Sequence, residues 1–313
     1  MKIVVTGALG HVGSALIRSL PFSFPGLELV MVDNLLTQRY SSLFDLPRGA
    51  QYRFVEADVS QADLGELFDG AHAVIHLAAM TEAAGSVGKA EEIEANNFRS
   101  TVRVSEACVA TGARLIALSS TSVYGTEKSI VAEDCGPEDL SPQSPYAETK
   151  LREEQHVQSL CEAEGLKAVI CRFGTIFGFS EGMRFHTAVN RFCWQAVMGT
   201  PLTVWKTAYD QTRPYLDLSD ACRALPFLIR EDLFDGRIYN VLTLNTTVGD
   251  IVETIREFVP EVQVDLVESP IMNQLSYEVS RQRFENEGFQ FAGDLRRGVA
   301  RTVGLLRGAN STG

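Results

Sequence analysis

The chain has 313 residues, of which 45% are hydrophobic and 22% are charged, a composition that fits a globular protein of one large or two smaller domains. The net charge is −12 and no basic run is present, which argues against a general role on nucleic acids or on anionic membrane surfaces. No stretch of about 18 or more apolar residues occurs, so we expect no membrane-spanning helix.

The six cysteines are scattered without any paired spacing such as CxxC, and the five histidines stand alone. We therefore expect reduced thiols, a cytoplasmic location and no metal site. The N-terminal segment MKIVVTGALG has only a short apolar run before its first glycine. This pattern is typical of a buried first strand and not of a signal peptide.

Short apolar runs alternate with helical patterns through the first two thirds of the chain. The predicted strands are residues 2–7, 28–33, 52–58, 73–79, 114–120, 167–173 and 237–242. Most of these runs are continuously apolar, as expected of strands that are covered on both faces of a parallel sheet. The helical patterns 91–112 and 146–165 each end at a glycine, as a C-cap should. This alternation predicts a doubly wound α/β fold.

The alternation of strands and helices loosens after about residue 175. We expect residues 1–174 to form the domain of the parallel sheet, to which residues 215–246 return. Residues 175–313 should mainly form a smaller lobe that is interleaved with the sheet in sequence.

The first predicted strand runs into GALGHVG, in which Gly7, Gly10 and Gly13 are spaced three apart. Such a glycine pattern is informative here because it follows a strand and opens a helix. Small residues let the backbone approach a pyrophosphate, and the helix N-terminus offers free N–H groups to it. The alternative is a tight turn without a ligand.

Asp33 ends the second strand, 20 residues after Gly13 (33 − 13). An acidic residue at this distance accepts hydrogen bonds from ribose hydroxyls, and it would repel a 2′-phosphate. No Arg immediately follows it, so we expect NAD in preference to NADP. Asp58 is a second candidate, for the adenine edge, with a helix N-cap as the alternative.

The stretch SPYAETK places Tyr146 four residues before Lys150, about one turn away on a predicted helix. On its own, such a pair is common on helix surfaces. Here the strand 114–120 ends in hydroxyl-bearing residues, and this strand end and the helix meet at the crevice where open sheets bind ligands. A nearby Lys⁺ and a positive nicotinamide would favour the Tyr146 phenolate, whose unperturbed pKa of about 10 makes it a poor base.

These features make the chain recognisable. It resembles the extended short-chain dehydrogenase/reductases, specifically the nucleotide-sugar epimerase/dehydratase family. The resemblance covers nearly the whole chain through VTGALGHVG, VDN, ADV, HLAA, NNFRST, LSSTSVYG, SPYAETKLREEQ, RFGTIFG, TRPYLDLSDACRA and YNV. It implies a Rossmann-type fold, NAD as the cofactor and a nucleotide-diphosphate sugar as the substrate.

The resemblance also assigns roles to single residues. Tyr146 and Lys150 match the catalytic YxxxK, and Ser120 matches the catalytic Ser/Thr position, with Thr121 as the alternative if the register slips by one. The expected cofactor contacts are Gly7, Leu9, Gly10, His11, Val12, Gly13, Asp33, Asn34, Asp58, Val59, Leu77, Ala78, Ala79, Asn97, Tyr146, Lys150 and Phe173. The expected substrate contacts are Thr81, Ser122, Thr175, Arg184, Asn190 and Arg213. For Arg184 a structural salt bridge is the alternative, and for Asn190 a helix-surface amide.

Several departures from the family pattern bear on the reaction. Sugar 4,6-dehydratases of the family follow the catalytic hydroxyl with an Asp-Glu pair, and decarboxylating members keep the Glu. This chain has Thr121 and Ser122 at these positions, so elimination is disfavoured. His11 stands where the family usually has Phe, and Thr175 stands where many epimerases have an Asn that contacts the diphosphate.

Three functions stay open on the sequence. The favoured one is an NAD-dependent nucleotide-sugar epimerase, acting at C4 by transient oxidation to a keto sugar. The second is a nucleotide-sugar dehydrogenase or 4-ketoreductase with net turnover of NAD(H), and the third is a non-catalytic dinucleotide-binding protein. The family also pairs two helices across a two-fold axis, so we expect a homodimer built on helices 91–112 and 146–165, unless these helices merely cover the sheet.

Overall fold

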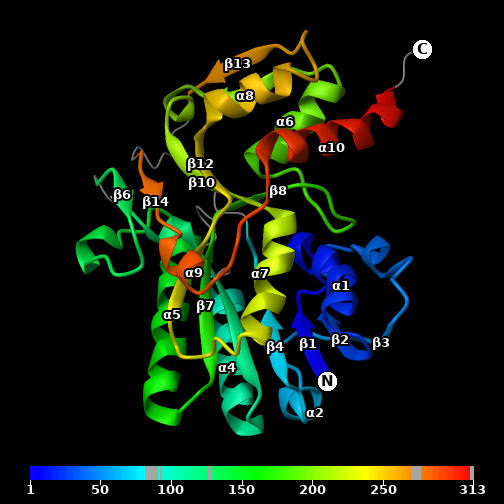
Figure 1. The fold of residues 1–313 in the computed structure, drawn as a ribbon, viewed down its shortest axis with the longest axis vertical. Helices are drawn as coiled ribbons and strands as arrows, with labels where there is room; N and C mark the ends of the chain where they lie inside the picture. Colours follow the sequence, from blue (N-terminus) through cyan, green and yellow to red (C-terminus); the bar gives the residue numbers. More distant parts are fainter. Residues whose placement is uncertain (82–90, 92–93, 126–127, 269–275, 311–313) are drawn as a thin grey trace.

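The computed structural model describes residues 1–81, 91, 94–125, 128–268 and 276–310 (Figure 1). Its centre is a parallel sheet of seven strands in the order β11-β7-β5-β4-β1-β2-β3. These strands are β1 (Lys2–Thr6), β2 (Leu27–Asp33), β3 (Ala50–Glu56), β4 (Ala73–His76), β5 (Arg114–Ser120), β7 (Ala168–Phe173) and β11 (Ile238–Val241). All seven predicted strands are confirmed, and so is the doubly wound fold.

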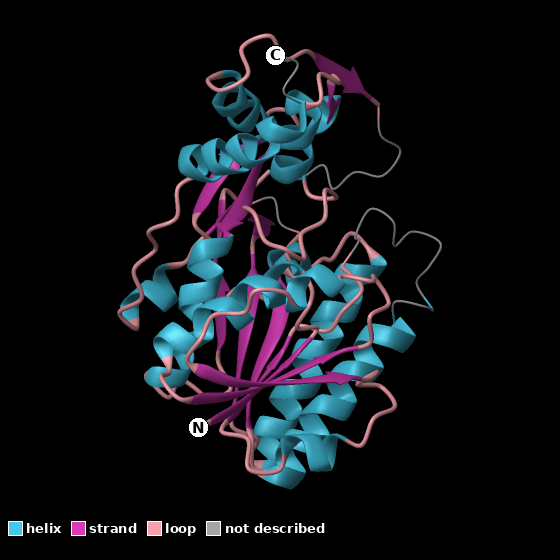
Figure 2. Ribbon diagram, turned by 90° about the vertical axis from the view of Figure 1, so that its right-hand side faces the viewer, coloured by secondary structure: helices cyan, strands magenta, loops and turns pink. Residues whose placement is uncertain are grey.

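Helices cover both faces of the central sheet, as the view along its edge in Figure 2 shows. One face carries α1 (His11–Ser23), α7 (Leu218–Arg230) and α9 (Gln282–Asn286); the other carries α2 (Leu64–Phe68), α4 (Arg99–Thr111) and α5 (Pro145–Glu164). Each face has its own apolar core, which explains why the strands are continuously apolar.

The two predicted helices of the second face end where their glycines lie. Gly112 and Gly165 both have a φ of 71° and act as left-handed C-caps. Helix α5 begins at Pro145, and the Ser144 side chain caps it by accepting a hydrogen bond from the Ala147 N–H. A π-helical turn, Glu94–Phe98, precedes α4, so the regular helix starts later than residue 91; residues 92 and 93 lie outside the described part.

A smaller lobe sits beyond the carboxyl ends of the strands (Figure 1). It contains a sheet of β8 (Thr175–Phe177), β10 (Thr212–Asp217) and β12 (Leu244–Thr247), a strand pair of β9 (Leu202–Trp205) and β13 (Val264–Val267), and helices α6 (Ala188–Val197), α8 (Val248–Arg256) and α10 (Leu295–Arg307). A further pair joins β6 (Ile130–Val131) to β14 (Glu278–Val279). Short 3₁₀ turns span Tyr40–Leu43, Thr121–Val123, Pro137–Asp139, Lys206–Ala208 and Gly308–Asn310.

The chain passes between the central sheet and the smaller lobe more often than the boundaries expected from the sequence indicated. β11 returns to the central sheet within the predicted segment 215–246. A later segment also returns: Phe284 and Phe289 are buried in the core beneath the central sheet, with Phe291 packed against it. No periodic pattern in the sequence indicates this return, because the aromatic residues lie on a short helix and a loop.

Candidate functional site

A glycine cradle lies where β1 passes into α1. Gly7 has a φ of +64°, and a Cβ at this position would stand 2.6 Å from the Ala78 nitrogen. A Cβ on Gly13 would stand 2.3 Å from the Gly7 carbonyl oxygen. Both positions therefore require glycine, and their small size brings the strand end, the helix and the Leu77–Ala78 backbone into close contact.

The N-terminus of α1 has no side-chain cap, because its N-cap residue is Gly10. The first N–H groups of a helix have no intrahelical partner, and the helix dipole adds a partial positive charge there. This end of the 13-residue helix α1 therefore fits a dinucleotide pyrophosphate, with the predicted contacts Leu9, His11 and Val12 around it.

Asp33 ties the glycine cradle to the end of β2. Its carboxylate accepts hydrogen bonds from the Leu9 N–H at 3.0 Å and from the Leu35 N–H at 2.9 Å. Each carboxylate oxygen has a second lone pair, so the group can also accept from a ribose hydroxyl. The neighbouring Asn34 is exposed and accepts from the Leu36 N–H.

Asp58 caps a turn and not a helix. Its side chain accepts a hydrogen bond from the Ser60 N–H at 2.8 Å, and Val59 is buried beside it. The next helix, α2, is capped by Asp63. The helix-cap alternative for Asp58 is therefore wrong, and its role at the adenine edge stays a prediction.

Arg39 is a basic residue that the sequence reasoning missed. Leu35 and Gln38 have positive φ values of 54° and 52°, and the chain between them folds Arg39 back toward the cradle. A Cβ on Gly10 would lie 3.5 Å from the Arg39 Nη1. The pKa of Arg39 is lowered by burial and by the nearby Arg184 cation, while Asp33 opposes this. Arg39 does not follow Asp33 directly, and the turn, not its spacing from Asp33, brings it to the cradle.

A segment of the smaller lobe, residues 178–186, closes over the cradle. A Cβ on Gly182 would stand 2.1 Å from the Leu9 carbonyl oxygen. The Gly182 N–H donates to Ser14 Oγ at 2.9 Å, and the Ser180 hydroxyl donates to the His11 carbonyl at 2.8 Å. The cradle therefore has walls from both the sheet and the smaller lobe.

His11 fixes this segment. Its Nε2 lies 2.8 Å from the Gly178 carbonyl oxygen, and since a carbonyl only accepts, Nε2 carries the proton and donates. Burial lowers the pKa of His11 to about 4; the bond to Gly178 opposes this, and Arg39 and Arg184 add to the lowering. Its imidazole is thus neutral near pH 7, and its ring holds the wall of the site.

Two predicted substrate residues meet across the site. Arg184 donates a hydrogen bond to the Thr81 hydroxyl at 3.1 Å, although 103 positions separate them. Within the described part of the chain Arg184 makes this contact and no salt bridge, which was the alternative. His186 lies close by, and burial followed by Arg184 lowers its pKa to about 4.

The other predicted substrate residues have different surroundings. Thr175 is exposed on β8, which pairs in parallel with β10, the strand that carries Arg213. Arg213 donates to Gln211 Oε1 at 3.0 Å and lies over the Tyr277 ring, 5.3 Å from its centroid.

Asn190 is fully buried, and its amide both accepts from the Gly178 N–H and donates to the Gly178 carbonyl. The helix-surface alternative is therefore wrong for Asn190, and any contact with substrate would require this pair to open.

Asn97 organises the end of β4. It lies in the π-helical turn before α4, is buried, and accepts a hydrogen bond from the Met80 N–H at 2.8 Å while donating to the Met80 carbonyl at 2.9 Å. The strand ends at His76, so the predicted contacts Leu77, Ala78 and Ala79 form an irregular segment that Asn97 fixes. Phe173, at the end of β7, is buried at the same edge of the sheet and faces Ser120 in register.

The hydroxyl groups after β5 have separate environments. Ser120 Oγ accepts hydrogen bonds from the Ser122 N–H at 3.1 Å and from the Ser122 hydroxyl at 2.9 Å. The Ser120 proton stays available for another acceptor. Thr121 is buried, and its hydroxyl donates to the Phe173 carbonyl at 3.3 Å. This geometry favours Ser120 over Thr121 as the residue that contacts a substrate.

Tyr146 and Lys150 lie on the first turns of α5, which packs against β5 and the turn that contains Thr121. The Lys150 Nζ is 5.9 Å from the centroid of the Tyr146 ring. The pKa of Tyr146 is raised: burial raises it most, Lys150 lowers it, and Glu153 raises it further. The expected effect of Lys150 is thus present but is outweighed.

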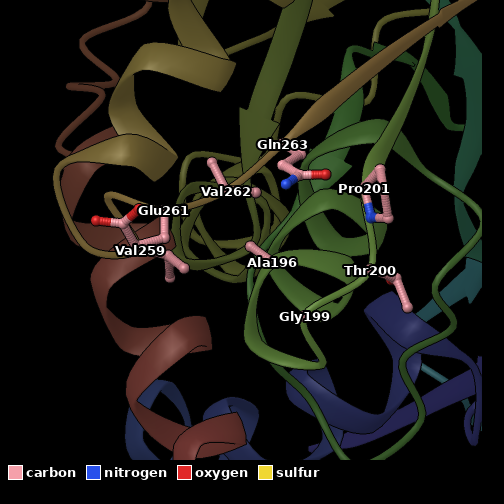
Figure 3. Close-up of a pocket in the computed structure, with 8 residues that line it drawn as sticks. All are labelled: Ala196, Gly199, Thr200, Pro201, Val259, Glu261, Val262 and Gln263. Atoms are coloured by element: carbon pink, nitrogen blue, oxygen red, sulfur yellow. The ribbon is translucent and has the colours of Figure 1, made fainter.

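The pocket drawn in Figure 3 is elsewhere. It has a volume of about 270 Å³ and lies in the smaller lobe, lined by Ala196, Gly199, Thr200, Pro201, Val259, Glu261, Val262 and Gln263. None of these residues is a predicted site residue.

Among the described residues, no three His, Cys, Asp or Glu side chains gather as a metal site would require. No helix in the described part is long and apolar enough to cross a membrane.

Known proteins resemble the chain along most of its length. Trifunctional UDP-glucose 4,6-dehydratase/UDP-4-keto-6-deoxy-D-glucose 3,5-epimerase/UDP-4-keto-L-rhamnose-reductase RHM1 of Arabidopsis thaliana is 26% identical over 316 residues, which cover 96% of this chain and 46% of that protein. The chain thus spans less than half the length of this relative. The uncharacterized UDP-glucose epimerase YtcB of Bacillus subtilis is 29% identical over 247 residues, covering 77% of this chain and 76% of YtcB.

The structure of MoeE5 in complex with UDP-glucuronic acid and NAD superposes with a TM-score of 0.85 at 27% identity, covering 99% of this chain and all of that one. The family model of the NAD dependent epimerase/dehydratase family matches residues 3–241, which include the glycine cradle, Asp33, Ser120, Tyr146 and Lys150. The cradle fits the cofactor that this family uses. The chain therefore belongs to the NAD dependent epimerase/dehydratase family.

Proposed function

We propose that the protein is a nucleotide-sugar epimerase that inverts C4 of its substrate by transient oxidation to a keto sugar. The observation that carries this proposal is the position of Tyr146 and Lys150 on α5, which packs against β5 and against the turn that Ser120 caps, with Thr121 and Ser122 where an elimination would need carboxylic acids. Thr121 is buried and donates to a backbone carbonyl, so it cannot act as an acid in water loss.

In this mechanism Tyr146, as a phenolate, takes the proton from the sugar hydroxyl, and Ser120 orients that hydroxyl. NAD, which the glycine cradle and Asp33 would hold, would supply the oxidation of the same carbon and its later reduction. The keto sugar turns in the site between these two steps, and Tyr146 then returns the proton to the oxygen. Lys150 stabilises the phenolate by its charge.

We assign the nucleotide diphosphate to the smaller lobe, and NAD to residues 1–174 with the returning segment 215–246. Arg213 and Thr175 lie on paired strands at the lobe, and Arg184 extends from the segment that covers the cradle. Two guanidinium groups supply charge for a diphosphate against the net charge of −12 of the whole chain. The MoeE5 complex with UDP-glucuronic acid supports a UDP sugar as the first substrate to test.

A homodimer through α4 and α5 stays part of the proposal. Of the apolar residues on these helices, Val104, Cys108, Ala147, Val157 and Leu160 are buried within the monomer. Val102, Ala107 and Leu151 are partly buried and offer the remaining apolar contacts. Sedimentation velocity of the purified chain distinguishes a dimer from a monomer.

The function is tested by incubating the protein, supplied with NAD, with UDP-glucose, UDP-glucuronic acid, UDP-N-acetylglucosamine and dTDP-glucose. An isomerised product without net change in NADH absorbance supports the epimerase. A net absorbance change identifies the dehydrogenase or ketoreductase alternative, and an unsaturated or deoxy product would contradict the assignment. If Tyr146→Phe left turnover intact, the proposed chemistry would be wrong.

A further inference from the structure

Lys150 forms a buried ion pair with Glu153, one turn further along α5. The Lys150 Nζ lies 2.8 Å from Glu153 Oε2, and both side chains are only 6% exposed. Nζ also donates to the Leu118 carbonyl at 2.9 Å. Two of its three N–H donors are thus used by the protein, which leaves one for a ligand.

Glu154, the next residue of α5, is also buried, but both of its carboxylate oxygens accept hydrogen bonds. Arg172 binds it with two hydrogen bonds, from Nε at 2.9 Å and from Nη2 at 2.6 Å, and the Ser119 hydroxyl donates to the same carboxylate. The Glu154–Arg172 pair is therefore close to neutral as seen from Tyr146.

Glu153 differs from Glu154 in one respect. Its Oε1 is buried and has no hydrogen-bond partner among the residues that the structure describes. Within the described part of the chain, Lys150 is its one ion-pair partner, through the other oxygen. A buried carboxylate with one free oxygen exerts a strong field on its neighbours, because little water screens it.

We propose that Glu153 is a positioning residue of the active site, which holds the Lys150 ammonium group and cancels part of the positive charge that acts on Tyr146. This inference rests on the proposed roles of Tyr146 and Lys150. Its consequence is that the phenol form of Tyr146, which returns the proton to a keto sugar, is favoured over the phenolate.

The groups around the pair agree with this role. The pKa of Lys150 is raised: burial opposes its charge, but Glu153, Tyr146 and, as the smallest contribution, Glu154 together outweigh burial. His76, on β4, faces Lys150, and burial followed by Lys150 lowers its pKa to about 3, so it stays neutral and adds no charge. Lys150 therefore remains a cation across the working pH range, and Glu153 is the group whose charge opposes it at Tyr146.

The test is an ultraviolet titration of tyrosinate in the purified protein, with and without saturating NAD⁺. Subtracting the titration curve of Tyr146→Phe from that of the wild type gives the titration of Tyr146 alone. The same subtraction is made between Glu153→Gln and the double variant Glu153→Gln/Tyr146→Phe. Since Gln keeps the acceptor but removes the charge, we expect the Tyr146 midpoint to fall by about one pH unit. Glu153→Asp, which keeps the charge, and Glu148→Gln, which removes an exposed charge from the same helix, should leave it unchanged.

An unchanged midpoint in Glu153→Gln would overturn the proposal, whatever the turnover of the protein. If that variant does not fold, Glu153→Ala removes the same charge and leaves room for water, and the same shift is expected. Turnover then separates this inference from the proposed function. Retained activity in Tyr146→Phe contradicts the function, whereas an inactive Tyr146→Phe with no shift in Glu153→Gln contradicts only the role of Glu153.

Discussion

Arg184 donates a hydrogen bond to Thr81 at 3.1 Å and so joins the segment that covers the glycine cradle to the segment that follows β4. One of these residues is charged and the other is not. Substituting each in turn therefore separates the contact between them from the charge that Arg184 presents to a ligand.

We expect Arg184→Ala to weaken binding of a UDP sugar about tenfold or more, because a charge-assisted hydrogen bond to a phosphate or carboxylate is worth about 1.5–3 kcal/mol. Thr81→Val breaks the same contact but keeps the charge, so its effect should be smaller. Isothermal titration with UDP-glucose and UDP-glucuronic acid measures both. Equal losses would show that Arg184 acts only by holding Thr81.

Arg39→Ala should lower the affinity for NAD about tenfold, because Arg39 lies beside Gly10 at the anion-binding end of α1. Arg39→Lys should lose less, and the affinity of the wild type should depend more steeply on salt than that of Arg39→Ala. Fluorescence titration with NAD gives these values. Arg48→Ala, an exposed residue of the same loop, serves as the control, and a loss of equal size there would refute the assignment.

Gly182→Ala should destabilise the closed segment, because its Cβ would stand 2.1 Å from the Leu9 carbonyl oxygen. The backbone must shift, and overpacking of this kind costs about 1–3 kcal/mol. We expect a lower melting temperature and weaker NAD binding. Gly304→Ala is the matched control: no atom lies within 4 Å of its Cβ, and it should slightly stabilise α10.

Ser120→Ala should mainly affect turnover, whereas Thr121→Val should mainly affect stability. Ser120→Ala should lower kcat about a hundredfold or more with little change in stability, because its proton is available to a substrate. Thr121→Val should mainly lower stability, since its hydroxyl is used by the Phe173 carbonyl. Steady-state kinetics and chemical denaturation distinguish the two, and the reverse pattern would place the catalytic hydroxyl at Thr121.

Stability should fall as the pH is lowered from about 6.5 toward 5. The pKa of His76 is lowered to about 3 and the pKa values of His11 and His186 to about 4, in each case mainly by burial. Below the unfolded pKa of about 6.5 the unfolded chain binds more protons than the folded one, so protonation favours unfolding. Denaturation at several pH values measures the slope. His76→Gln should flatten it, and an unchanged slope would show that His76 does not contribute.

The sequence was sufficient for the fold because burial on both faces of the sheet leaves continuous apolar runs, and all seven strands were found from them. It also indicated the glycine cradle and the Tyr146–Lys150 pair, whose spacings are local. Arg39 was missed because its place depends on two residues with positive φ. The pairing of Glu153 with Lys150, rather than with solvent, depends on burial that no local pattern records.

The return of the C-terminal segment to the central sheet has a further consequence. Phe284 and Phe289 stack with their ring centroids 4.7 Å apart, and Phe284 also packs against Tyr239 of β11 and Phe227 of α7. The segment before α10 thus covers part of one face of the central sheet. Ending the chain before Phe284 would expose the apolar core on that face, so this late segment contributes to the stability of the central sheet itself.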